Sequence, residues 1–381
     1  MPLPGKSSLP SQDTPLLDLV FQRIEKKEAN SIPFSEYMDL VLYDPECGYY
    51  SRPISREVGR QGDFYTSVSV GETYGFLLSE KIRSERADFL APGQPFRIVE
   101  QGAHDGQLAI DIVSALSKGA FSGLEDWEYC IVEPRPWVRA QLQERFKGET
   151  EFPLWGDRIR VVSSLQKASF PQGIFLCNEL LDAFPFDRVR KEGGRWKELQ
   201  VGKVERALDW VVRPLRPEIL SLAERLPGGL PEGYETEICP AIVPWMKDAA
   251  SLFEHGVWWF IDYGFEADDY YAPHRTTGTF RCFRDHRASE NPFEELGQTD
   301  ITAHVDFSLV RECGEQAGLT WDEYTDQHHF LTEAARDWLL SMEGQPPDAN
   351  AAKQIRQFQS LTHPGMMGKQ FKIATLRRPR P

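Results

Sequence analysis

Five short runs of consecutive apolar residues recur through the middle of the chain, and helical stretches separate most of them. Runs that are apolar at successive positions, without alternation, are typical of strands buried on both faces. The pattern therefore predicts an α/β fold in which a parallel sheet has helices on both sides. The runs are FRIVEQG (96–102), EYCIVEP (128–134), IRVVSS (159–164), GIFLCNEL (173–180) and GVWWFIDYG (256–264).

The regions on either side of this core read as helices and an antiparallel pair of strands. Apolar residues at helical spacing predict a first helix over about 14–28. A second helix is expected to begin with Ser35 as its N-cap and to end near Tyr43, and a third to cover about 71–86. Near the C-terminus, LTWDEYTDQ and FKIATLRR can pair antiparallel at one edge of the sheet.

Two interruptions of the core suggest further structure. Residues 186–255 separate the fourth and fifth runs, and Gly193-Gly194 within them predicts a hairpin turn between antiparallel strands. A long loop follows Gly264 and reaches about Val305, and loops of that length are usually functional. We therefore divide the chain into an N-terminal region 1–69 and a core 70–381, with 186–255 inserted as a subdomain on the substrate side.

Composition narrows the classes of partner. The chain has 43 Lys and Arg against 58 Asp and Glu, a net charge of −15, which argues against nucleic acid as the main partner. No apolar run approaches the roughly 20 residues of a membrane-spanning helix. The six cysteines stand singly, so we expect free thiols and no metal site. With no signal or transit pattern at the N-terminus, we expect a cytoplasmic protein, and a homodimer is compatible with the sequence.

Candidate chemistry gathers where the predicted strands end, the edge at which α/β folds bind ligands. The first strand ends in an E-x-G-x-x-x-G pattern formed by Glu100, Gly102 and Gly106, and the second ends in Glu133, which can bind paired ribose hydroxyls. This spacing lacks the tight glycines that a pyrophosphate needs, so it favours S-adenosylmethionine over a dinucleotide. A plain strand-to-helix turn that needs two glycines is the alternative.

Acidic groups follow the fourth and fifth strands. Asn178, Glu179 and Asp182 lie in the segment NELLDAFP, and Asp262 and Tyr263 lie in IDYG. Carboxylates beside an apolar stretch are costly unless they are paired or solvated, which favours a substrate clamp. A capped helix start with exposed acids is the alternative.

Together, seven segments resemble the MidA family, which is similar to the mitochondrial complex I assembly factors that act as protein-arginine methyltransferases. They span most of the chain in order, although His104 and Asp105 depart from the usual glycine-rich loop. The segments are GDFYTS (62–67), EQGAHDG (100–106), NELLDAFP (178–185), IDYG (261–264), GTFRCFRDHR (278–287), DITAHVDF (300–307) and GMMGKQFKIATL (365–376).

The resemblance implies a class I methyltransferase fold, with seven strands of which the last is antiparallel, and S-adenosylmethionine as the cofactor. It implies that the GDFYTS segment covers the cofactor. The expected cofactor contacts are Gly62, Asp63, Thr66, Ser67, Glu100, Gly102, Gly106, Glu133, Ser164, Leu165 and Asn178.

For the reaction, we expect methyl transfer to a protein arginine, with Glu179 and Asp182 holding the guanidinium and His304 taking a proton. His304 as a helix-entry residue bonded to backbone is the alternative. Asp262, Tyr263 and Asp300 are expected to contact the substrate. Two further functions stay open, a small-molecule methyltransferase and a non-catalytic assembly factor on the same fold.

Overall fold

The chain forms two compact units, each built from three separate stretches. The computed structural model describes residues 15–51, 66–91, 93–118, 127–148, 158–284, 287–344, 346 and 348–380. Unit 1 comprises Met1–Arg56, Phe184–Ala241 and Tyr271–Ala303. Unit 2 comprises Glu57–Ala183, Ile242–Tyr270 and His304–Pro381.

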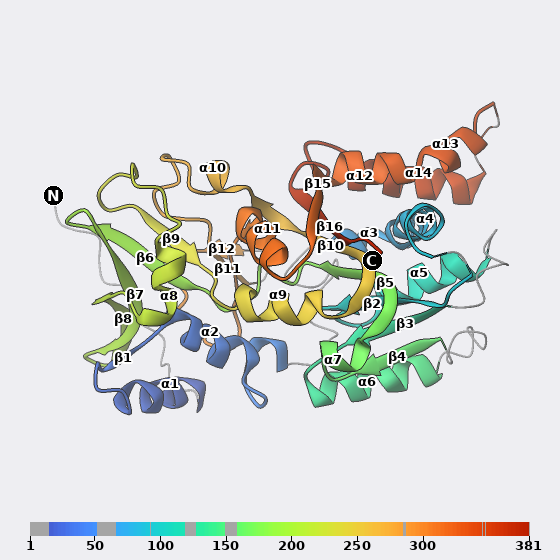
Figure 1. The fold of residues 1–381 in the computed structure, drawn as a ribbon. Helices are drawn as coiled ribbons and strands as arrows, with labels where there is room; N and C mark the ends of the chain where they lie inside the picture. The colour runs from blue at the N-terminus through green and yellow to red at the C-terminus, as the bar shows by residue number, and fades with distance from the viewer. Residues whose placement is uncertain are drawn as a thin grey trace. The chain divides into compact units, whose positions relative to one another are not determined.

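Unit 2 is built on a sheet that contains all five predicted apolar runs. The strand order is β15-β16-β10-β5-β2-β3-β4, and the short β14 also pairs with β10 (Figure 1). β16 is antiparallel to both of its neighbours, while β2, β3, β4, β5 and β10 are mutually parallel. The predicted α/β fold with an antiparallel last strand is therefore confirmed. The strands are β2 (Phe96–Gln101), β3 (Trp127–Val132), β4 (Ile159–Val162), β5 (Phe170–Asn178), β10 (Phe253–Phe265), β14 (Val305–Asp306), β15 (Thr320–Asp326) and β16 (Phe371–Arg378).

Helices cover this sheet in two packed sets. α4 contacts α5, α12 and α14, and α9 contacts α7 and α11. The two sets lie on either side of the sheet (Figure 1). Among the described residues, no helix is both long and apolar enough to cross a membrane. The helices of unit 2 are α3 (Ser67–Val70), α4 (Thr73–Asp88), α5 (Gln107–Lys118), α6 (Pro136–Gly148), α7 (Leu165–Ala168), α9 (Ile242–Ala250), α10 (Ala267–Tyr270), α11 (Phe307–Gln316), α12 (Gln327–Ala334), α13 (Arg336–Ser341) and α14 (Ala349–Thr362).

Unit 1 contains an antiparallel sheet and a small three-stranded sheet. The larger sheet has the order β1-β7-β6-β9, with β8 paired to β7. Gly193 and Gly194 link β6 to β7 with φ of 58° and 70°, which is the left-handed conformation that a tight hairpin turn requires. The elements are α1 (Pro15–Glu25), β1 (Ser31–Ile32), α2 (Phe34–Tyr43), a 3-10 turn (Tyr49–Ser51), β6 (Asp187–Glu192), β7 (Arg195–Val204), β8 (Ala207–Pro214), α8 (Pro217–Ala223), β9 (Glu235–Ile238), β11 (Arg281–Arg284), β12 (Arg287–Ser289) and β13 (Asp300–Thr302).

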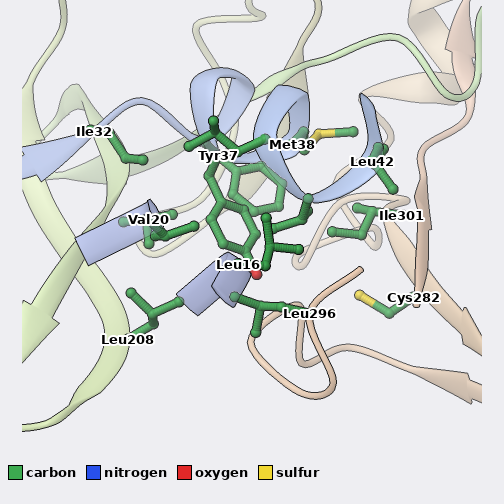
Figure 2. Close-up of a cluster of buried hydrophobic side chains, with 14 of the residues drawn as sticks. Leu16, Val20, Ile32, Tyr37, Met38, Leu42, Leu208, Cys282, Leu296 and Ile301 are labelled. Atoms are coloured by element: carbon green, nitrogen blue, oxygen red, sulfur yellow. The ribbon is translucent and has the colours of Figure 1, made fainter. Parts of the chain in front are cut away.

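A hydrophobic cluster joins the three stretches of unit 1. Leu16 and Val20 of α1, Tyr37 of α2, Leu208 of β8 and Ile301 of β13 all contribute buried side chains (Figure 2). These residues are far apart in sequence, so the N-terminal helices are part of the same core as the insertion. Burial of this apolar surface is what holds the unit together.

The structure moves two of the predicted boundaries. The insertion belongs to unit 1 only over 184–241, because α9 packs with the helices of unit 2, and the N-terminal residues share the core of unit 1. Ser35 is not an N-cap: α2 begins at Phe34 after Pro33. Both the backbone N–H and the hydroxyl of Ser35 donate to Asp187, at 3.0 and 2.7 Å.

Candidate functional site

The register of unit 2 brings the predicted strand-end residues to one edge of the sheet. Gln101 pairs with Val132 on one side and with Cys177 on the other, so the residues that follow all three strands are neighbours. Asn178 pairs with Ile261, which sets Glu179 beside Asp262. The edge therefore combines the glycine loop, Glu133 and the acidic segments after β5 and β10.

The loop after β2 is a tight turn that depends on its glycines. Gly102 and Gly106 have φ of +86° and +82°, and the N–H of Gly106 donates to the carbonyl of Ala103 at 2.7 Å. A Cβ at Gly106 would lie 2.7 Å from the ring of Phe146. His104, where the sequence departs from the resembled pattern, adopts a left-handed φ of 48°. The altered loop thus keeps a sharply turned backbone.

An arginine from α6 holds this loop. The Arg145 guanidinium contacts the Asp105 carboxylate at 2.9 Å, the Asp105 carbonyl, and the Gln107 amide oxygen at 2.7 Å. Burial would raise the pKa of Asp105, but hydrogen bonding and charge from His104, together with Arg145, lower it to about 2. Asp105 is therefore ionised at any ordinary pH, and the loop is anchored to the helix that follows β3.

Glu100 is buried at the end of β2 and is 2% exposed. Its carboxyl accepts a hydrogen bond from the Tyr129 hydroxyl at 2.8 Å. Burial raises the pKa of Glu100 to about 7, assisted by the charge of Asp105 and opposed by the bond from Tyr129. A carboxyl with this pKa is easily ionised by a nearby ammonium group.

Glu133 lies after β3 as predicted, but Arg135 already contacts its carboxylate. Oε1 accepts from the backbone N–H of Arg135 at 2.8 Å and from its Nε at 2.9 Å, and Oε2 accepts from its Nη2 at 2.9 Å. A carboxylate has about four acceptor positions, and these three bonds occupy three of them. Arg135 therefore competes with ribose hydroxyls for this carboxylate.

Glu179 follows β5 with a φ of 52°, which is rare for a residue with a side chain. Its carboxyl accepts from the Asn178 amide nitrogen at 3.0 Å and from the backbone N–H of Ser67. The Asn178 carbonyl in turn accepts from the Tyr74 hydroxyl at 2.6 Å. Burial and the charge of Asp182 raise the pKa of Glu179 to about 8, so the group is mostly neutral at pH 7.

Asp262 is engaged by backbone amides. Its Oδ2 accepts from the N–H groups of Leu180, Leu181 and Asp182 at 2.9–3.2 Å, and its Oδ1 from Tyr263 at 2.8 Å. Burial and the charge of Glu179 raise its pKa to about 7, against the lowering effect of these donors. These contacts make Asp262 the support of the loop that carries Asp182, so its expected contact with substrate stays a prediction.

His304 lies beside Tyr263. β14 pairs with the end of β10, with Val305 opposite Gly264, and the rings of His304 and Tyr263 are stacked with centroids 6.5 Å apart. Tyr263 also packs on Phe371 at 4.0 Å. His304 and Val305 thus lie beside Tyr263 and Phe371 at the edge of the sheet that holds Glu179.

The remaining predicted residues are distributed as follows. Gly62 and Asp63 lie outside the described residues. Thr66 caps α3, where its hydroxyl accepts from the Ser69 N–H at 3.2 Å and Ser69 bonds back in a capping box. Ser164 and Leu165 begin α7 directly after β4.

Asp300 belongs to unit 1, whereas the other predicted substrate residues, Asp262 and Tyr263, belong to unit 2. It is 3% exposed, and its carboxylate accepts from the Tyr50 hydroxyl at 2.9 Å. Contacts within unit 1 account for this carboxylate, and its expected contact with substrate stays a prediction.

Sequence reasoning missed three residues of the site. Tyr74 and Arg135 contact the predicted residues Asn178 and Glu133 through their side chains, and Arg145 contacts Asp105 in the loop between Gly102 and Gly106. Arg135 could have been found, because an arginine two positions after the ribose-binding acid can fold back on it. Tyr74 and Arg145 meet their partners 104 and 40 residues away, and no local pattern signals that.

Comparisons with known proteins agree with this geometry. A family model described as "Putative S-adenosyl-L-methionine-dependent methyltransferase" matches residues 78–325. A solved structure of a COG1565 superfamily member from Burkholderia thailandensis, bound to S-adenosyl-homocysteine, is 30% identical. That similarity covers 98% of this chain and 95% of the other, with a TM-score of 0.82.

Curated relatives are similar over most of their length. The mitochondrial protein arginine methyltransferase NDUFAF7 homolog of Drosophila melanogaster is 29% identical, over 91% of this chain and 81% of the relative. The human NDUFAF7 protein is 26% identical, over 95% and 83%. Both relatives are named as mitochondrial, which contradicts the cytoplasmic location expected from the sequence.

Proposed function

The chain belongs to the COG1565 superfamily of S-adenosyl-L-methionine-dependent methyltransferases, and we propose that its methyl acceptor is an arginine side chain of a protein. The observation that carries the proposal is a group of three carboxyls: Glu179 and Asp182 follow β5, and Asp262 lies in β10. Burial raises the pKa values of Glu179 and Asp262, and repulsion adds to it, from Asp182 on Glu179 and from Glu179 on Asp262. A cation bound there would relieve that repulsion. The names of the curated relatives support the same acceptor.

The residues at the other end of the edge fit the cofactor. S-Adenosylmethionine supplies an electrophilic methyl group on a sulfonium. Glu133 offers a carboxylate to the ribose, Glu100 can ionise beside the ammonium, and Gly102 has no side chain at the turn, where a Cβ would lie 3.2 Å from Leu180. These carboxyls and the tight glycine turn match the chemistry of the group.

The chain's residues would act on the acceptor. A guanidinium is protonated at ordinary pH, and ionised Glu179 and Asp182 would bind two of its nitrogens so that the third faces the methyl group. When the new C–N bond forms, the C–S bond breaks and its electron pair stays on sulfur. The attacking nitrogen then loses a proton, and we assign His304 as the group that accepts it.

Labelling of a host lysate with isotopically labelled cofactor tests the acceptor, using cells that lack the endogenous protein. We expect label in methylarginine, and label in lysine or in small molecules would contradict the proposal. Glu179→Gln should keep its affinity for S-adenosyl-homocysteine and lose at least about a hundredfold in turnover, since a buried charged contact to the acceptor is lost. Loss of cofactor affinity instead would assign Glu179 to the nucleoside site.

The non-catalytic alternative has one specific observation in its favour, the contact of Arg135 with Glu133. It predicts that titration with S-adenosyl-homocysteine gives no saturable binding while the fold is intact. Saturable binding by the purified protein would remove this alternative.

A further inference from the structure

Tyr74 is buried beneath the acidic segment and has no role in the function described so far. It is the second residue of α4 and is 1% exposed. Its hydroxyl donates to the Asn178 carbonyl at 2.6 Å, and the Asn178 amide nitrogen donates to Glu179 Oε1 at 3.0 Å. Two hydrogen bonds thus connect the tyrosine to the carboxyl proposed to hold the acceptor.

The tyrosine determines which group donates and which accepts in these two hydrogen bonds. Burial and the charges of Glu179 and Glu100 raise the pKa of Tyr74 well above its usual value, so its hydroxyl keeps its proton and donates. Because the Tyr74 hydroxyl donates, the amide oxygen of Asn178 must be the atom that faces it. The NH₂ group then faces Glu179, where a donor favours the ionised carboxyl and a carbonyl oxygen would favour the neutral one.

The position of Glu179 depends on such supports. Its φ of 52° is unfavourable for a residue with a Cβ, and such conformations persist only where surrounding contacts hold them. The backbone N–H of Glu179 donates to the Ile261 carbonyl at 2.9 Å, and the N–H of Ser67 donates to its carboxyl. Asn178 provides the remaining described hydrogen bond to the carboxyl.

We propose that Tyr74 is a positioning residue for methyl transfer, because its hydroxyl fixes the Asn178 amide so that the NH₂ group stabilises the cation-binding, ionised form of Glu179 when a cation arrives. This inference rests on the proposed function. Other groups that act on Glu179 stay the same when the hydroxyl is removed. They are the carboxyls of Asp182 and Asp262, the Tyr263 hydroxyl and the backbone of Ser67.

Tyr74→Phe is the direct test, because it removes one oxygen and keeps the ring. The rise of kcat/KM with pH should move by about half to one pH unit toward higher pH, since the lost bond stabilised the ionised carboxyl. At pH 7 that shift lowers kcat/KM by about three- to tenfold. The dissociation constant of S-adenosyl-homocysteine should stay within about twofold of wild type. An unmoved pH profile would overturn the proposal.

Ser79→Ala is the matched control on the same helix. Ser79 is fully buried and its hydroxyl donates to the Phe76 carbonyl at 2.6 Å, so the variant removes one buried hydroxyl that bonds within its own helix. Its pH profile should equal that of wild type. If Ser79→Ala shifts the profile as far as Tyr74→Phe does, general loosening of α4 explains the effect and the proposal is wrong.

A second variant and a direct measurement complete the test. Asn178→Asp keeps an acceptor for Tyr74 and removes the donor to Glu179, so it should move the profile in the same direction even if Tyr74→Phe does not fold. With ¹³C-labelled glutamate, the Glu179 carboxyl signal, assigned by its loss in Glu179→Gln, should titrate at higher pH in Tyr74→Phe. This titration of the Glu179 carboxyl is measured without a methyl acceptor. It therefore supports or overturns the inference even if the proposed arginine acceptor is wrong.

Discussion

At the residue scale, Glu179 and Asp262 show how two adjacent carboxyls acquire different properties. Four backbone N–H groups donate to Asp262, and one amide nitrogen and one backbone N–H donate to Glu179. Two neighbouring carboxyl groups repel each other when both are ionised, so ionising the second costs additional free energy. The carboxyl that accepts fewer hydrogen bonds therefore keeps its proton. Near neutral pH the proton therefore rests on Glu179, which can lose it when a cation arrives.

Stability should depend on pH through Glu179. Its folded pKa of about 8 lies above its ordinary value of 4.5, so the folded state binds more protons between those values. This contribution to stability is fully present below about pH 4.5, declines as the pH rises, and is lost above about pH 8. We expect Glu179→Gln to match wild type in Tm at about pH 4.5 and to exceed it by about 1–3 °C at pH 9. Calorimetry that shows the same difference at both pH values would contradict this.

At the element scale, α6 supports the loop that follows β2 through side chains of its last turn. Its last turn supplies Arg145 to Asp105 and the ring of Phe146 against Gly106. The helix that supports this loop begins three residues after Glu133. The glycine loop and Glu133, both expected to contact the cofactor, are therefore linked to the same helix. His104 and Asp105, which depart from the resembled motif, have become part of this support.

Arg145→Met should weaken cofactor binding, because the loop loses its charged anchor while the apolar part of the side chain is kept. The contact is partly exposed, so we expect a rise of about three- to tenfold in the dissociation constant of S-adenosyl-homocysteine by titration calorimetry. Lys147→Met, which removes an exposed charge two positions away, is the control and should bind as wild type does. Equal affinities for the two variants would show that the anchor is dispensable.

At the scale of the whole molecule, the residues expected to bind the cofactor and to hold the guanidinium belong to one unit, and the inserted segment 184–241 belongs to the other. The described cofactor candidates, together with Glu179, Asp182 and His304, lie in unit 2, and the insertion shares a core with the N-terminal helices in unit 1. Each unit is completed by distant stretches of chain, so neither can form from a single segment.

Leu16→Ala should test this separation. The side chain is 2% exposed within the cluster of unit 1, and such truncations cost about 2–5 kcal/mol. We expect denaturant unfolding to show that loss, while the affinity for S-adenosyl-homocysteine at low temperature stays within about twofold of wild type. A large loss of affinity in the folded variant would mean that the core of unit 1 shapes the cofactor site.

The order of residues along the chain is enough to predict the sheet and its ligand-binding edge. Apolar runs ending in Glu100, Glu133, Asn178 and Asp262 specify parallel strands because each run is buried on both faces, and parallel strands place their carboxyl ends together. The Gly193-Gly194 turn was likewise local, because only a left-handed backbone closes so short a hairpin. Local patterns of this kind need no knowledge of distant residues.

The roles of those residues depend on contacts that form only in the folded protein. The Tyr74–Asn178 bond, the Arg145–Asp105 pair and the Ser35–Asp187 contact each join distant positions, and no spacing within a window of sequence encodes them. The same holds for the amides that converge on Asp262 and for the placement of Asp300 in unit 1. Which carboxyl is neutral and which is ionised depends on how many donors the folded chain directs at it, and that number exists only after the strands have assembled.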